Sequence, residues 1–126
     1  MQLTVTQNRD VNIVRVKESR LTYPILAAFY AEVRQIVEDG ARRLLIDLED
    51  VTYIDSAGVG CLIDIHNLVE RRDGTLRLSS LQPRVETMLL MVGVHKVVHV
   101  DRKQADALAA FGLTAMPNGE FPAHTV

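Results

Sequence analysis

The sequence predicts an α/β domain in which about four helices pack on a single mixed β-sheet of about five strands. Apolar residues alternate with polar ones in some segments, as in strands, and recur at helical spacing in others. The segments follow the order β-β-α-β-α-β-α-β-α, and each strand–helix–strand unit must bury its sheet face under the connecting helix. With 126 residues, of which 48% are hydrophobic, the chain has the size and the core of one domain.

The first segment is expected to be a β-hairpin, followed by a long amphipathic helix. Apolar and polar residues alternate over residues 3–16, around a turn-like sequence at 8–10. Thr22 is a suitable N-cap for the helix, Pro24 stands in its first turn, and apolar residues continue at helical spacing until Gly40. The hairpin therefore leads into a helix of about four turns.

The rest of the chain alternates between strands and helices. Residues 43–48 are almost continuously apolar, which indicates a central strand buried on both faces. Residues 51–54 are expected to be a strand that runs directly into a helix, which lasts until Asp73-Gly74. The expected elements after it are a strand at 75–79, a helix at 83–92, a strand at 96–100 and a helix at 103–111. Residues 1–112 thus form one domain, and residues 113–126, which contain two prolines and no periodicity, are expected to be a loose tail.

The composition argues against several classes of function. Lys and Arg total 14 against 16 Asp and Glu, and a formal charge of -2 is too balanced for a protein that binds nucleic acid. No apolar run approaches the roughly 20 residues of a spanning helix, so no direct membrane insertion is expected. Cys61 is the only cysteine, which excludes an intramolecular disulfide and a multi-cysteine zinc site and suits the cytoplasm. We expect neither a metal nor a cofactor.

The junction at residues 54–60, Ile-Asp-Ser-Ala-Gly-Val-Gly, is the sharpest local feature. One interpretation is structural, because Asp and Ser are preferred helix N-caps and Gly allows a close approach of the backbone. The other is functional, because a phosphate on Ser56 would place about two negative charges where the dipole and free N–H groups of a helix favour an anion. The two interpretations are compatible, since one junction can cap a helix and carry a modification.

The motifs of common enzyme classes are missing from the sequence. Gly58 and Gly60 are not followed by the third glycine of a dinucleotide fingerprint, and the chain has no Gly-Lys-Ser/Thr sequence of a P-loop. Ser56 lacks the glycine two positions earlier that a hydrolase nucleophile elbow requires, and no histidine lies near it in the sequence. We therefore expect that the chain is not an enzyme.

Residues 44–60 resemble the signature stretch of the STAS domain family of bacterial anti-sigma factor antagonists. Residues 76–85 and 89–94 are similar to the strand, helix and return strand that follow in that family. The resemblance covers about residues 3–111, and the Asp-Ser-x-Gly sequence at 55–58 is its most specific part. It implies a STAS fold for this chain.

The resemblance also implies a partner-switching protein. In that family the unphosphorylated protein binds an anti-sigma factor and thereby frees the sigma factor for transcription. The anti-sigma factor is itself an ATP-dependent serine kinase that phosphorylates the serine after the aspartate, and a phosphatase reverses the modification. The corresponding position here is Ser56. The chain would then be a phosphoprotein and the substrate of its partner.

The junction and the exposed face of the following helix are the expected docking surface for such a partner. The expected contact residues are Asp55, Ser56, Ala57, Gly58, Asp64, Asn67 and Arg71. A phosphate beside Asp55 would weaken docking, because it adds charge to a surface that must lose water on binding.

The loop at residues 17–22 departs from the family pattern, which has an aspartate there that this chain lacks. Arg20 in this loop can offer a bidentate cation to a phosphate on Ser56, or it can be an ordinary solvated arginine. The departure leaves an alternative function open, since STAS domains also occur in stressosome-like assemblies and in membrane transporters. The chain would then be a non-switching interaction subunit. Whether it forms a homodimer is open as well.

Overall fold

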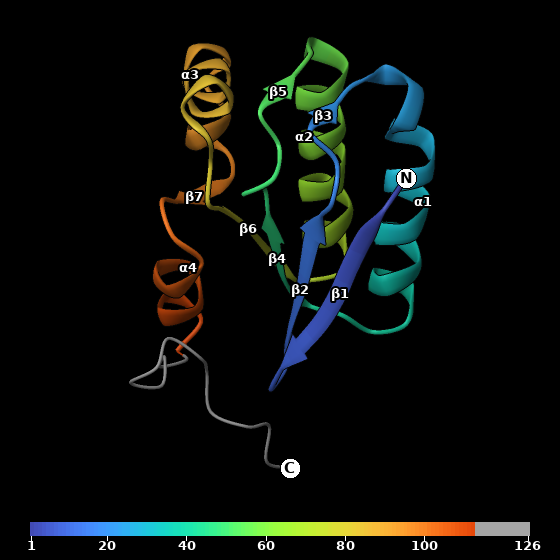
Figure 1. The fold of residues 1–126 in the computed structure, drawn as a ribbon. Helices are drawn as coiled ribbons and strands as arrows, with labels where there is room; N and C mark the ends of the chain where they lie inside the picture. Colours follow the sequence, from blue (N-terminus) through green and yellow to red (C-terminus); the bar gives the residue numbers. More distant parts are fainter. Residues whose placement is uncertain (113–126) are drawn as a thin grey trace.

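The chain folds around a five-stranded β-sheet (Figure 1). The structure is a computed structural model, and it describes residues 1–112. In spatial order the strands are β1 (Leu3–Asn8), β2 (Val11–Val16), β4 (Arg43–Asp47), β6 (Thr75–Ser79) and β7 (His99–Asp101). β1 is antiparallel to β2, and the other neighbouring strands are parallel. The predicted mixed sheet is confirmed.

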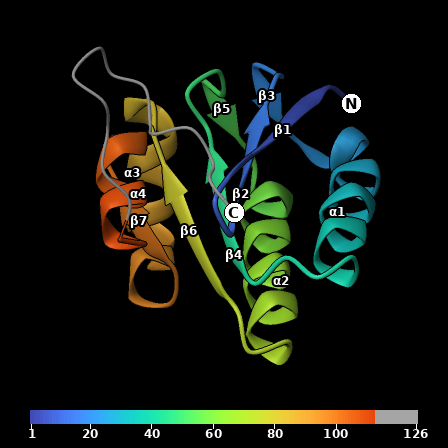
Figure 2. The ribbon, with the colours of Figure 1, turned by 90° about the horizontal axis from the view of Figure 1, so that it is seen from below.

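Four α-helices accompany the sheet in the described part of the chain. They are α1 (Tyr23–Glu38), α2 (Ser56–Arg71), α3 (Pro83–Val92) and α4 (Gln104–Ala110). α1 and α2 lie side by side on one face (Figure 2), and α4 packs against β4, β6 and β7. The four predicted helices are thus confirmed, with ends that agree to within about two residues.

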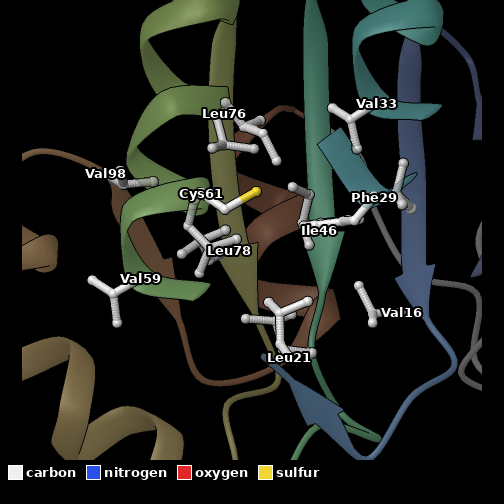
Figure 3. Close-up of a cluster of buried hydrophobic side chains, with 14 of the residues drawn as sticks. Val16, Leu21, Phe29, Val33, Ile46, Val59, Cys61, Leu76, Leu78 and Val98 are labelled. Carbon is white, nitrogen blue, oxygen red and sulfur yellow. The ribbon is translucent and has the colours of Figure 1, made fainter. Parts of the chain in front are cut away.

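The larger part of the core lies between the sheet and helices α1 and α2. Phe29 of α1 and Cys61 of α2 gather with Ile46 and Leu78 of the sheet in one buried cluster (Figure 3). Leu45 of β4 belongs instead to a second cluster, which includes Leu108 of α4. Successive residues of β4 therefore enter two different apolar layers, which explains the almost continuous apolar run at 43–48.

A second, two-stranded sheet joins the predicted loop at residues 17–22 to the end of the strand predicted at 51–54, of which residues 53–54 are confirmed as a strand. β3 (Arg20–Leu21) pairs in parallel with β5 (Tyr53–Ile54), so that Arg20 lies opposite Tyr53 and Leu21 opposite Ile54. Leu21 and Ile54 are both buried in the main core. This short pairing fixes the segment before α1 beside the segment before α2.

The strand predicted at residues 96–100 is wrong in its position. Residues Val94–Lys96 form a short 3-10 helix, and β7 begins at His99. Gly93 adopts a left-handed conformation with φ of 87°, and the N–H of Val98 donates to the carbonyl of Val94 at 2.8 Å. The chain therefore turns once more before it joins the sheet.

Two remaining predictions concern the ends of the domain and the membrane. The expected loose tail at 113–126 lies outside the described residues, so the domain boundary at 112 stays a prediction. Within residues 1–112, no helix combines the length and the apolar character needed to cross a membrane.

Candidate functional site at the start of helix α2

Asp55 is the N-cap of α2 and also holds the start of α1. Its Oδ1 accepts a hydrogen bond from the N–H of Gly58 at 2.7 Å, and its Oδ2 accepts one from the N–H of Tyr23 at 3.1 Å. Thr22 occupies the predicted N-cap position of α1, but its side chain makes no capping bond. The Asp55 carboxylate therefore satisfies donors at two helix N-termini.

Ser56 is the first residue of α2, and its side chain is exposed. Asp55 is the capping residue, so the structural interpretation of the junction applies to Asp55 and the functional interpretation applies to its neighbour Ser56. α2 has no acidic residue in its first turn, and the carboxylate next to Ser56 is that of the N-cap Asp55. The site thus presents a serine hydroxyl at the positive end of a helix.

Gly58 lies in the interior beneath this serine. A Cβ at this position would lie 2.4 Å from the carbonyl oxygen of Leu21 and 2.6 Å from Cγ1 of Ile54. Only a residue without a side chain lets the first turn of α2 approach β3 and β5 so closely. Gly58, an expected docking residue, is buried. It lets α2 pack closely on β3 and β5 and so supports the docking surface from beneath.

The other expected docking residues follow the outer side of α2. Asp64, Asn67 and Arg71 are exposed, and Ala57 is half-buried. Ala57 and Asp64 also line a groove between α1 and α2, of about 520 Å³. The remaining residues of this groove are Tyr23, Pro24, Leu26, Ala27, Tyr30, Gly60 and Cys61.

Tyr23 forms a part of this surface that sequence reasoning missed. Its side chain is 77% exposed although it is large and aromatic, and it lies at the mouth of the groove. The Tyr-Pro pair directly after the N-cap was visible in the sequence. The closeness of Tyr23 to Ser56 was not visible in the sequence, because it depends on the pairing of β3 with β5.

Arg20 lies on the ring of Tyr53. Its guanidinium carbon is 4.4 Å from the ring centroid, within the range of a cation–π contact. A second arginine, Arg84 in the first turn of α3, approaches the same ring at 5.3 Å. Sequence reasoning named Arg20 as a candidate phosphate contact but did not find Arg84 or Tyr53.

Cys61 lines the groove but is chemically protected. Its side chain is buried, and desolvation, with a smaller contribution from Asp64, raises the pKa of its thiol to about 11. A thiol with such a pKa carries little thiolate near neutral pH. We therefore assign Cys61 to the core and not to chemistry at the site.

Residues 2–107 match the STAS domain family. The chain belongs to the STAS domain family. Among curated relatives, it is 31% identical over 68 residues to the anti-sigma-B factor antagonist of Bacillus subtilis, which covers 54% of this chain and 62% of that protein. The match thus spans less than two thirds of the length of that STAS relative. The resemblance inferred from the sequence is confirmed at the level of the family.

Solved structures agree on the STAS fold. An anti-sigma factor antagonist from Mycobacterium paratuberculosis superposes with a TM-score of 0.79 at 21% identity, over 86% of this chain and 92% of that one. Unphosphorylated SpoIIAA gives a TM-score of 0.73 at 18% identity, over 88% and 96%. A sulfate transporter family protein from Wolinella succinogenes gives 0.71 at 20% identity, over 80% and 84%. At these identities the likeness concerns the fold alone.

Proposed function

We propose that this STAS domain is an anti-sigma factor antagonist that is switched by phosphorylation of Ser56. Its unphosphorylated form binds an anti-sigma factor that is also a serine kinase, and so promotes sigma-factor-dependent transcription. One observation carries the proposal: Ser56 is exposed at the first residue of α2 while Asp55 performs the capping. The relationship to an anti-sigma-B factor antagonist supports the choice of partner.

The proposed docking surface has a polar and an apolar part. Asp64, Asn67 and Arg71 supply polar groups along α2, while the groove beside them is largely apolar. Interfaces commonly combine an apolar centre with a polar rim, and Tyr is enriched in their centres. Tyr23 at the mouth of the groove is thus a suitable anchor for the partner.

Phosphorylation of Ser56 weakens docking in this proposal. A phosphate adds nearly two negative charges beside Asp55, at a surface that has to lose its water when the partner binds. The chain supplies the accepting hydroxyl, and the partner supplies ATP and the catalytic groups. A phosphatase restores the binding form. Because the kinase uses ATP, the proposed location of the chain is the cytoplasm. The chain is a substrate in these reactions and not an enzyme.

A non-switching interaction subunit is the second candidate, and the fold shared with a sulfate transporter family protein favours it. Recovery of partners from the source cell separates the two. Capture of transporter or scaffold components without a serine kinase would favour the second candidate.

Incubation with the cognate kinase and ATP, followed by mapping of the phosphate by mass spectrometry, tests the first proposal. We expect one phosphate, on Ser56, which disappears in Ser56→Ala and remains in the control Ser19→Ala. Modification at another residue, or none, would contradict the proposal.

A further inference from the structure

Two arginines from distant parts of the sequence converge on one aromatic ring near Ser56. Arg20 comes from β3 and Arg84 from α3, and their guanidinium carbons lie 4.4 and 5.3 Å from the centroid of Tyr53. Both arginine side chains are exposed at their positions, whereas Tyr53 is half-buried. The two cations are thus held at the surface by the ring.

Neither arginine has an acidic partner among residues 1–112. Arg15, Arg43 and Arg77 each form an ion pair within 4.0 Å, but no carboxylate of the described residues lies that close to Arg20 or Arg84. A cation–π contact at the surface is weaker than a charge-assisted, bidentate bond between a guanidinium and a phosphate. Both side chains are therefore available to an anion that comes within reach.

Tyr53, the ring that both arginines contact, lies shortly before Ser56 in the sequence. Arg20 is the strand neighbour of Tyr53, and the N–H of Asp55 donates to the carbonyl of Leu21 at 3.4 Å. Ser56 follows directly, at the start of α2. Arg84 approaches the same Tyr53 ring from α3, because α3 contacts β5.

We infer that Arg20 and Arg84 form the binding site for a phosphate monoester on Ser56, and that Tyr53 holds both guanidiniums while the serine is unmodified. The inference rests on the proposed modification of Ser56. When the phosphate is present, the arginines leave the ring and donate to its oxygens. Phosphorylation then uncovers Tyr53 and joins α3 to the start of α2, so a partner meets a rearranged surface as well as added charge.

The titration of the phosphate provides a test that needs neither the kinase nor the anti-sigma factor. Phosphoserine is incorporated at position 56 during translation, and the second pKa of the phosphate is followed by phosphorus NMR. In Arg20→Gln/Arg84→Gln we expect this pKa to be higher than in the parent protein by roughly one unit, because nearby cations favour the dianion. Arg84→Lys should lie between the two, since it keeps the charge and loses the bidentate geometry.

A charge-matched control removes two arginines at the far end of the molecule. Arg9 lies in the turn before β2 and Arg72 at the end of α2, whose 16 residues separate it from Ser56. Arg9→Asn/Arg72→Gln should leave the phosphate pKa at the parent value, and Asn suits the positive φ of 55° at position 9. Equal values in all variants would overturn the inference. A shift of equal size in the control would also overturn it, because the effect would then be one of net charge.

Failure of this inference and failure of the proposed function are distinguishable. If the kinase modifies Ser56 but the arginine variants do not move the phosphate pKa, the switch stands and the arginine site does not. If the pKa shifts as expected but no cognate kinase acts on Ser56, the arginine site stands and the proposed switch does not.

Discussion

Asp55 and Tyr23 are 32 residues apart in the sequence, yet the carboxylate of Asp55 accepts a hydrogen bond from the N–H of Tyr23 at 3.1 Å. The other carboxylate oxygen accepts from Gly58 at 2.7 Å. One side chain therefore fixes the first turns of α1 and α2 relative to each other. Because the groove between these helices and the exposed Ser56 both start there, Asp55 determines the shape of the proposed docking surface.

Replacement of Asp55 tests this double capping. Asp55→Ala removes both acceptors and should lower the free energy of unfolding by about 2 kcal/mol, from one lost N-cap and one further hydrogen bond. Asp55→Asn keeps a single carboxamide oxygen, so it should cost about half as much. Urea denaturation measures both, with Asp64→Ala on the exposed side of α2 as a control that should stay within about 0.5 kcal/mol. An equal loss for Asn and Ala would argue against two separate capping bonds.

Gly58 and Gly60 offer a matched pair of substitutions on the same helix. Gly58→Ala should destabilise the protein by about 1–3 kcal/mol, because its Cβ would meet the carbonyl oxygen of Leu21 at 2.4 Å. Gly60→Ala should stabilise it by about 0.5–1 kcal/mol, because nothing lies within 4 Å of its Cβ and Ala favours the helix. The same urea experiment decides, and two effects of the same sign would contradict the packing described for Gly58.

Cys61 should react slowly with alkylating reagents in the folded protein. With its pKa raised to about 11, mainly by desolvation, little thiolate is present around pH 8. We expect alkylation by iodoacetamide to be at least about 100-fold slower than in denaturing urea, where the thiol regains its ordinary pKa. The folded rate should rise steadily as the pH increases toward this pKa. Equal rates in the two states, measured by mass spectrometry, would contradict the burial of Cys61.

The apolar groove between α1 and α2 should contribute to partner binding without supporting the fold. Tyr23 is 77% exposed, so Tyr23→Ala should change the free energy of unfolding by no more than about 0.5 kcal/mol. Its loss from the docking surface should weaken binding to the anti-sigma factor by about tenfold or more, as expected for an aromatic anchor. Calorimetric titration measures this affinity, and Tyr23→Phe serves as the control that keeps the ring. Unchanged affinity in Tyr23→Ala would remove the groove from the proposed interface.

The elements that the sequence predicted are those with a long periodic or continuous apolar signal. The run at 43–48 indicated a central strand because Leu45 and Ile46 enter opposite apolar layers. β3 has only two residues, which is too short for a recognisable pattern, and β5 is the second half of the strand expected at residues 51–54. Their pairing depends on the burial of Leu21 and Ile54 in the tertiary structure.

The candidate site was predictable only in its local part. Asp55 and Ser56 stand next to each other in the sequence, so a capping residue and an adjacent serine could be inferred from the junction itself. The contact of Asp55 with Tyr23 and the approach of Arg84 to Tyr53 join residues that are far apart along the chain. Such contacts follow from the packing of whole elements, for which a single sequence carries no local signal.

The affinity of the anti-sigma factor for the two forms of this chain tests the central claim most directly. Calorimetric titration, without ATP, compares unmodified protein with protein that carries phosphoserine at position 56. We predict that the phosphate weakens binding by at least about tenfold, or about 1.4 kcal/mol, because charge is added where the interface must lose water. Ser56→Ala should bind like the unmodified protein. Equal affinities of the phosphorylated and unmodified forms would contradict the proposal that Ser56 is the switch.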